Sequence, residues 1–424
     1  MSACCYIKTV VFFTVAISLS ACVSQAPVES ESVIDPLPEA FSEFRSELKN
    51  VEEALRQFPA YSSEAERVAG YRHLSRAIVK TIQAEILQDA DFPYFRVLDF
   101  WIREGGDNPD QHYAFSPIRG GEDYRVWGQL GSAKRMELQL YAGEPWDGTG
   151  RSAGYLPFED IEFDADGNFE IFLGLNPQQN GGLYNPEDTT TIFARHIYDE
   201  WSEETTGHIH IDRIGHEGDR LSVSSANNLA NRFRAAVSTL KKTVVGWPYF
   251  VQKRYTNNFS VNTISPLMDS YAVGGVRGRW MGGGYFNISP GKVLVIKTWP
   301  TTADYQAIQL TDLWFASMEY GNRVTSLNTT QSVLSSDGAY YFVISQQDPG
   351  HANWLDTGDL NRGTILMRYD GVQAKINADL YPTAELINLS QLSEYIPGLK
   401  RVTEAERGRV RAERRRHLQI RTGR

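Results

Sequence analysis

Residues 136–141 read Met-Glu-Leu-Gln-Leu-Tyr, so that an apolar side chain alternates with a more polar one. Successive side chains of a β-strand point to opposite faces, and this period of two predicts a half-buried strand. The alternation recurs at residues 169–173 and 209–211, and short apolar runs stand at 292–296 and 340–345. Gly-Gly, Asn-Pro and Asp-Gly pairs favour turns between such runs. We therefore predict a mainly β protein built from β-sandwich or jelly-roll-like domains.

Four stretches show the spacing of amphipathic helices instead. They are residues 39–58, 63–86, 226–244 and 403–417. The second and fourth begin with capping-box pairs, Ser63 with Glu66 and Thr403 with Glu406. The expected apolar face of the second helix is formed by Val68, Tyr71, Leu74, Ile78, Ile82 and Ile86.

The N-terminal residues have the pattern of a secretory signal. Lys8 precedes an apolar run at 9–18 that is too short to cross a bilayer comfortably. The run ends in Leu-Ser-Ala-Cys at 19–22, which resembles the bacterial lipobox, where the Cys is acylated and becomes the new N-terminus. We expect a lipid (palmitate-type) anchor on Cys22, with Val23 resembling an outer-membrane address facing the periplasm. The alternative is an ordinary signal peptide that contains a Cys.

These patterns divide the chain into consecutive regions. We expect a lipoprotein signal peptide at 1–21, a tether at 22–37, a helical N-terminal region at 38–90, a first β-sandwich at 91–225, a joining helix and linker at 226–258, a second β-sandwich at 259–375, and a C-terminal extension with a basic helix at 376–424.

The composition limits the classes of partner. The three Cys residues are Cys4, Cys5 and Cys22, so a processed chain would hold no free thiol and no disulfide. The net charge is −10, although nine Arg and three Glu give residues 401–424 a charge of +6. An acidic body argues against nucleic acid as a partner. The basic helix either attracts anionic headgroups or lies on the acidic body.

Three segments carry a family resemblance. Residues 314–323 read Trp-Phe-Ala-Ser-Met-Glu-Tyr-Gly-Asn-Arg, residues 326–328 read Ser-Leu-Asn, and residues 348–357 read Asp-Pro-Gly-His-Ala-Asn-Trp-Leu-Asp-Thr. In this order they resemble the bacterial family called domain of unknown function 1214, with weaker agreement at 70–72 and 106–110. His351 departs from the pattern, which usually has an apolar residue there. The resemblance implies a jelly-roll-like β-sandwich and no known reaction.

The same segments hold the leading candidate site. Amides, a guanidinium and an indole are groups that bind sugars, through forked hydrogen bonds and an apolar ring face. The candidate ligand-binding residues are Asn322, Arg323, Asn328, Gln331, Asn353 and Trp354. Glu319 and Asp356 are candidate acid and base or nucleophile for glycoside hydrolysis. The alternative is a structural role, with Arg323 and Asp356 as a buried ion pair.

Two further patterns are weaker. His208, His210 and Asp212 alternate on a predicted strand, so they share a face and are weak metal-ligand candidates, with a third His from position 112, 196 or 216; the alternative is a solvent-facing polar face. Residues 274–284 are rich in glycine and contain two Arg, which together could cradle an anion, but no P-loop Lys follows. We expect a mobile loop between the domains, which could rim a cleft.

No Gly-x-Ser-x-Gly or His-Glu-x-x-His motif is present, and no pattern indicates a cofactor. The leading functional hypothesis is a lipid-anchored envelope protein that binds a glycan or a similar polar envelope ligand, including a lipid. A glycan hydrolase using Glu319 and Asp356 is the first alternative. A structural or assembly lipoprotein without a small-molecule site is the second.

Overall fold

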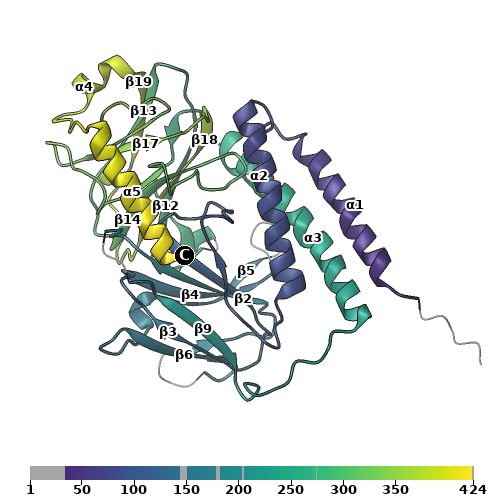
Figure 1. Cartoon of the computed structure of the whole chain (residues 1–424). Helices are drawn as coiled ribbons and strands as arrows, with labels where there is room; N and C mark the ends of the chain where they lie inside the picture. Colours follow the sequence, from purple (N-terminus) through teal and green to yellow (C-terminus); the bar gives the residue numbers. More distant parts are fainter. Residues whose placement is uncertain (1–33, 144–149, 178–181, 203–204, 274, 423–424) are drawn as a thin grey trace, which may run out of the picture.

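The computed structural model describes residues 34–143, 150–177, 182–202, 205–273 and 275–422. The predicted signal peptide, Cys22 and most of the tether lie outside these residues. Within them, no helix combines the length and the apolar character needed to cross a membrane. The described chain is mostly β, with four sheets and a few helices, so the predicted fold class is confirmed (Figure 1).

The first sandwich consists of two antiparallel-rich sheets that face each other across an apolar core. One has the order β1-β2-β8-β4-β5 and the other β7-β6-β3-β9. The strands are β1 (Arg96–Leu98), β2 (Gln111–Pro117), β3 (Tyr124–Gln129), β4 (Arg135–Ala142), β5 (Arg151–Leu156), β6 (Asn168–Gly174), β7 (Leu183–Tyr184), β8 (Thr191–Ile197) and β9 (His208–Arg213).

The second sandwich pairs a sheet of order β10-β12-β18-β14-β15, with β11 against β12, and a sheet of order β17-β16-β13-β19. The strands are β10 (Thr263–Ile264), β11 (Met268–Asp269), β12 (Trp280–Asn287), β13 (Lys292–Thr298), β14 (Tyr305–Thr311), β15 (Ser326–Asn328), β16 (Tyr340–Ser345), β17 (Trp354–Asp356), β18 (Arg362–Asp370) and β19 (Thr383–Asn388). Because β19 pairs with β13, this sandwich continues past residue 375, where we expected it to end.

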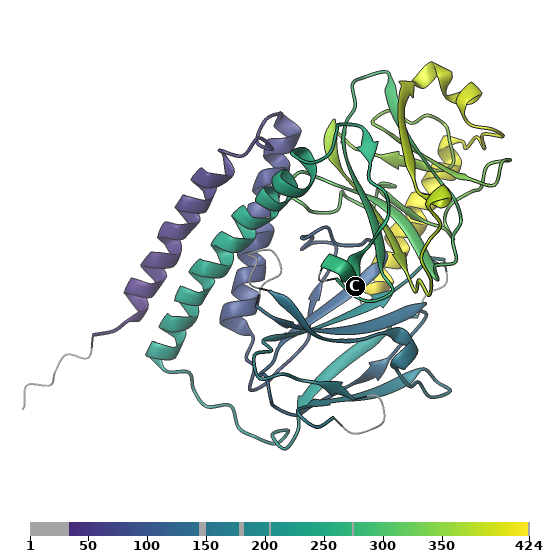
Figure 2. The ribbon, with the colours of Figure 1, turned by 180° about the vertical axis from the view of Figure 1, so that it is seen from behind.

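Helices α1 (Leu37–Leu55), α2 (Glu64–Thr81) and α3 (Ala226–Val251) form a layer beside the sandwiches, with α3 packed against both others (Figure 2). π-helical turns extend α2 over Ile82–Leu87 and α3 over Gln252–Thr256. The short α4 (Leu392–Tyr395) follows β19, and α5 (Glu404–Arg421) runs from the second sandwich to the first (Figure 1). Single 3₁₀ turns lie at Phe158–Asp160, Ser270–Val273, Ala378–Leu380 and Leu389–Gln391.

The capping boxes predicted for α2 and α5 are both formed. The predicted apolar face of α2 is only partly correct, because Val68 is 48% and Tyr71 37% exposed. The indole of Trp314 packs on another face of α2, at Gly70, where an added Cβ would lie 2.7 Å from the ring. The side of α2 that carries Gly70 therefore faces the protein, and Val68 and Tyr71 face outward.

Strand β4 is buried on both faces, although its sequence predicts one solvent-facing side. Met136, Leu138 and Leu140 enter the core of the first sandwich, as expected. Glu137 and Gln139 point the other way but are only 3% and 1% exposed. That face meets the second sandwich, so the polar half of the alternation marks an interface between domains rather than a surface in water.

Candidate functional site

The candidate carboxylates of the 319–356 region are engaged within the protein. Glu319 accepts hydrogen bonds from the backbone N–H groups of Gly321 and Asn322, at 3.0 Å each, and from the Asn322 side chain at 3.1 Å. Asp356 is paired with Arg323 at 3.1 Å and accepts from the Gly358 N–H at 2.7 Å. Burial raises the pKa of Asp356, and Arg323 opposes that rise. Both carboxylates thus hold turns of the chain.

The candidate ligand-binding groups are also occupied. Asn353 brackets Val333 with a donated and an accepted hydrogen bond, both 2.8 Å long. Trp354 is 7% exposed, donates its indole N–H to the Ser345 carbonyl at 3.0 Å, and lies 5.0 Å from the Arg407 guanidinium.

Asn328 and Gln331 likewise bond to each other, and Asn328 donates to the Asp199 carbonyl at 2.9 Å. These groups already make contacts within the protein, as the structural alternative expects, and binding of a glycan by them stays a prediction. The alternative structural interpretation fits these residues.

The two weak metal candidates lie close together without completing a site. His210 Nε2 is 3.2 Å from His208 Nδ1, while the Asp212 carboxylate accepts from the Trp127 indole at 2.7 Å. Among the described residues, no group of three or more His, Cys, Asp or Glu side chains is placed to hold a metal.

The glycine-rich segment is not the loop that we expected. Its second half, residues 280–284, belongs to β12, while Gly274 lies outside the described residues. A Cβ at Gly284 would lie 2.3 Å from the Thr263 carbonyl oxygen, and one at Gly283 would lie 2.9 Å from Tyr255. These glycines let neighbouring elements approach β12 closely.

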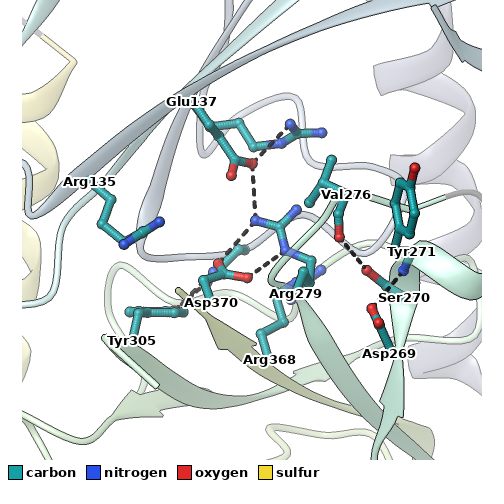
Figure 3. A network of polar contacts seen from close by, with 12 residues as sticks. Arg135, Glu137, Asp269, Ser270, Tyr271, Val276, Arg279, Tyr305, Arg368 and Asp370 are labelled. Atoms are coloured by element: carbon teal, nitrogen blue, oxygen red, sulfur yellow. Dashed lines mark hydrogen bonds and ion pairs between the residues drawn. The ribbon is translucent and has the colours of Figure 1, made fainter. Parts of the chain in front are cut away.

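A network of buried charges joins the two sandwiches (Figure 3). Glu137 on β4 accepts from Arg195 and Arg279, at 3.0 Å each, and from the Tyr155 hydroxyl at 2.8 Å. Arg279 also holds Asp370 of β18 with contacts of 2.6 and 3.0 Å. Burial would raise the pKa of Glu137, but the two guanidiniums outweigh burial and lower it to about 2. Each carboxylate is matched by arginine, which is the arrangement of a structural clamp.

The C-terminal helix is likewise part of the fold. Arg407, Arg414 and Arg421 repeat every seven residues and are all buried. Arg407 pairs with Asp348 at 2.9 Å, and Arg421 donates to the Pro109 carbonyl at 2.7 Å. Of the two interpretations of the basic tail, the structure matches the helix that lies on the body.

An open cleft of about 630 Å³ lies between α2 and β1. Its size is in the range usual for small-molecule sites. The lining combines two cations, an exposed indole, aliphatic groups and short polar side chains: Ser75, Arg76, Val79, Gln83, Arg96, Val97, Asp99, Trp101 and Ile102. None of these residues was among the candidates that the sequence suggested.

Arg76 is the distinctive group of this cleft. Its side chain makes no hydrogen bond or ion pair with any residue in the described part of the chain, whereas its neighbour Lys80 pairs with Glu104 at 3.1 Å. Burial, followed by the nearby Arg103 charge, lowers the pKa of Arg76 to about 10. The group stays charged at neutral pH in a place that disfavours a lone cation, so an anion bound there would be stabilised.

The rest of the lining suits a ligand with polar groups and a ring. Trp101 is 57% exposed, and its indole rests on Phe100 with ring centroids 4.2 Å apart. Gln83 lies in the π-helical extension of α2, and its Oε1 is buried without a hydrogen-bond donor among the described residues. π-helical turns often occur at functional sites.

A sequence signal for this cleft exists. Arg72, Arg76 and Lys80 are spaced four residues apart on one helix, and no acidic residue lies three or four positions from Arg72 or Arg76. Like charges at this spacing destabilise a helix slightly, so such a row indicates a partner from elsewhere. Lys80 forms an ion pair with Glu104, whereas Arg72 and Arg76 form none with the described residues.

Comparison with known proteins bears on the fold. No protein-family model and no curated protein matches this chain. An uncharacterised protein from Burkholderia cenocepacia, solved by crystallography, superimposes with a TM-score of 0.76 at 24% identity, over 83% of this chain and 97% of that one. The VPA0106 protein from Vibrio parahaemolyticus matches with a TM-score of 0.40 at 9% identity, over 75% and 98% of the two chains. The first likeness shows a shared fold, and the second is too distant to support an argument.

Proposed function

We propose that this is a lipid-anchored cell-envelope protein that binds a polar, negatively charged ligand, of the chemistry of an acidic sugar, in the cleft between α2 and β1. The observation that carries the proposal is the half-buried Arg76 guanidinium, which lines the cleft and makes no hydrogen bond or ion pair with the described residues. The charges of Asp312 and Asp107 act on it only from beyond ion-pair distance. A guanidinium binds a carboxylate through two parallel hydrogen bonds, which gives direction as well as affinity.

The ring contact supports a sugar over a simple inorganic anion. An exposed indole face offers apolar area to the C–H face of a pyranose, and Trp101 stands beside the arginine in the same lining. Gln83 adds an amide for hydroxyl groups. The lipid anchor rests on the Cys22 pattern alone, and it would keep such a binder at the membrane surface.

Binding without hydrolysis fits the lining better than catalysis does. Glycoside hydrolysis needs two carboxyl groups flanking the bond. Among the described residues that line the cleft, Asp99 is the single carboxylate, and it already accepts from the Trp101 N–H at 2.9 Å. Glu319 and Asp356, the pair suggested by the sequence, do not line the cleft.

Calorimetric titration of the purified protein with glucuronate, glucose and phosphate tests the proposal. We expect saturable binding of glucuronate, weaker binding of phosphate and none of glucose. Arg76→Gln and Trp101→Ala should each weaken glucuronate at least about tenfold while leaving the melting temperature unchanged, because both side chains reach the cleft surface.

Trp354→Ala is the matched control for Trp101→Ala. Trp354 is buried, so its removal should lower the melting temperature and leave the affinity of the remaining folded protein intact. Binding of glucose equal to that of glucuronate, or full affinity in Arg76→Gln, would contradict the proposal.

A further inference from the structure

A second hollow, of about 360 Å³, continues the cleft along α2. It shares Ser75 with the first, and its lining is Tyr61, Glu64, Arg67, Val68, Tyr71, Arg72 and Ser75. Together the two hollows follow the outer side of α2 from Glu64 to Gln83. At 1.5 Å per residue this groove is about 28 Å long, far longer than one sugar needs.

Positive charge runs along this groove. Arg72 makes no side-chain hydrogen bond or ion pair with the part of the chain that the structure describes, and it stands one turn from Arg76. The Arg72 charge contributes to the lowered pKa of Arg76, after burial and Arg103. Arg67 donates to the Ser62 carbonyl and forms no ion pair with an acid among the described residues. Two acids line the groove: Glu64 in the second hollow, at the helix N-terminus that favours it, and Asp99 in the first, where it accepts from the Trp101 N–H.

Aromatic faces accompany the charges at both ends. Trp101 stands at one end, and Tyr61 and Tyr71, with ring centroids 6.4 Å apart, stand at the other. The Tyr71 hydroxyl donates to Glu52 at 2.7 Å and accepts from Arg56 at 2.7 Å, so its ring is fixed while 37% of the residue stays exposed. A fixed ring loses little entropy when a ligand stacks on it.

We propose that the ligand is a linear acidic oligosaccharide long enough to occupy both hollows, with carboxylates meeting Arg76 in one and Arg72 in the other. This inference rests on the proposed function and specifies the ligand's length and charge spacing. When one ligand carries two linked groups that bind two subsites at once, its affinity exceeds that of either group alone. Single-stranded nucleic acid also carries negative charges and rings, and it is therefore the competing ligand in the test.

Titration with galacturonate oligomers of increasing length, at fixed ionic strength, tests the inference. We expect the affinity to rise with length and to level off once the oligomer spans the groove. Arg72→Gln should weaken the long oligomer about tenfold and leave the single galacturonate unchanged, whereas Arg76→Gln should weaken both. Arg415→Gln, which removes an exposed charge from α5, is the matched control and should change neither.

The outcomes separate this inference from the proposed function. If the single sugar binds through Arg76 but longer chains bind no more tightly, or Arg72→Gln has no effect, the inference is overturned and the single-site function stands. If neither the single sugar nor the oligomer binds, both are overturned. If an oligothymidylate binds as tightly as the oligosaccharide with the same dependence on Arg72, the assignment to an acidic saccharide is overturned.

Discussion

Single residues in this protein show how costly charges are retained in its interior. Glu137 is 3% exposed and faces Arg195 and Arg279, which are themselves held by Gln139 and Asp370. Removing a charge from water costs several kcal/mol, which is regained only if every lone pair and N–H finds a partner. The network meets that condition by combining groups from both sandwiches, so its stability depends on their correct docking.

Glu137→Gln should therefore destabilise the protein by roughly 3–5 kcal/mol, because two buried guanidiniums lose a shared counter-charge. Urea unfolding followed by tryptophan fluorescence measures the change. Glu170→Gln is the matched control, since Glu170 pairs with Arg125 at the surface, where such a pair contributes less than about 1 kcal/mol. Equal effects of the two changes would show that the buried network contributes no more than a surface pair.

The residues behind the family resemblance have a similar structural explanation. Asp107 accepts from the Ser317 N–H at 2.9 Å and from its hydroxyl at 2.7 Å. Asp110 accepts from the Tyr305 hydroxyl at 2.6 Å and from the Trp201 indole at 2.9 Å. Segments 106–110 and 305–317 thus bind each other across the domain interface. The family membership itself stays a prediction, and these contacts show what the shared residues do in this chain.

At the scale of elements, one close approach helps to position α2. Trp314 donates its indole N–H to the Glu66 carbonyl at 3.0 Å and packs on Gly70. With the packing of α2 on α3 and the ion pair between Glu66 and Arg362, this contact turns the Gly70 side of α2 towards the protein and leaves Arg72 on the groove side.

Gly70→Ala should destabilise the protein by about 1–3 kcal/mol, because its Cβ would lie 2.7 Å from the Trp314 ring. Gly408→Ala is a control within α5, where a Cβ meets nothing within 4 Å, and it should stabilise by about 0.5–1 kcal/mol. Thermal melts of the two variants should therefore shift in opposite directions. A melting temperature for Gly70→Ala at or above that of the parent would contradict the packing described here.

Strands β2 and β8 place the half-buried His112 directly opposite His196, which is 1% exposed. Burial, aided by Arg421, lowers the pKa of His112 to about 4; burial, aided by His112 and His208, lowers that of His196 to about 3. In the unfolded chain these histidines take up protons near pH 6.5. Their neutral burial therefore contributes fully to the free energy of unfolding above that pH, and the contribution decreases as the pH falls towards 4.

His196→Gln should make this acid-induced loss of stability shallower between pH 6.5 and 4, as measured by melting temperature against pH. Asp312 acts in the opposite direction, since burial raises its pKa to about 6, and the comparison between variants removes its contribution. An unaltered slope in His196→Gln would contradict the assignment to this residue.

The elements themselves were largely predictable, since alternation identified β4, β6 and β9, and capping boxes identified the starts of α2 and α5. The groove was not, for a physical reason. Val68 and Tyr71 match a core-facing period, and they are turned outward by contacts between residues far apart in sequence, such as that of Trp314 with Gly70. Likewise, nothing local distinguishes Trp354, which is buried by Arg407, from Trp101, which is exposed.

At the scale of the whole molecule, the two sandwiches meet through many polar contacts and through small apolar clusters, such as that of Ile197, Tyr305 and Ala307, and not through one large shared core. Their apolar cores are separate, the charged network lies between them, and α5 crosses from one to the other (Figure 1). Polar interfaces depend on geometry more strictly than apolar ones, because each misplaced partner leaves a buried group unsatisfied. The helix layer packs on this frame, so the groove on α2 depends on it as well.

Arg414 tests whether α5 couples the sandwiches. Its guanidinium donates to the Tyr320 carbonyl at 2.9 Å and to the Ser326 hydroxyl at 2.8 Å, both in the second sandwich. It also lies 4.3 Å from the Trp201 ring, which belongs to the first. Arg414→Gln should cost about 3 kcal/mol or more, since buried carbonyls lose charged donors. Arg415→Gln, at the next and exposed position, should change stability by less than about 0.5 kcal/mol.

Calorimetry distinguishes coupling from simple loss of stability. If α5 joins the sandwiches, Arg414→Gln should lower the melting temperature and broaden or split the unfolding transition, because each sandwich keeps its own core and then unfolds separately. Arg415→Gln should retain the parent's transition. A single transition, lowered but equally sharp in Arg414→Gln, would show that the buried network around Glu137 suffices to couple the sandwiches, and that α5 contributes stability without transmitting it from one sandwich to the other.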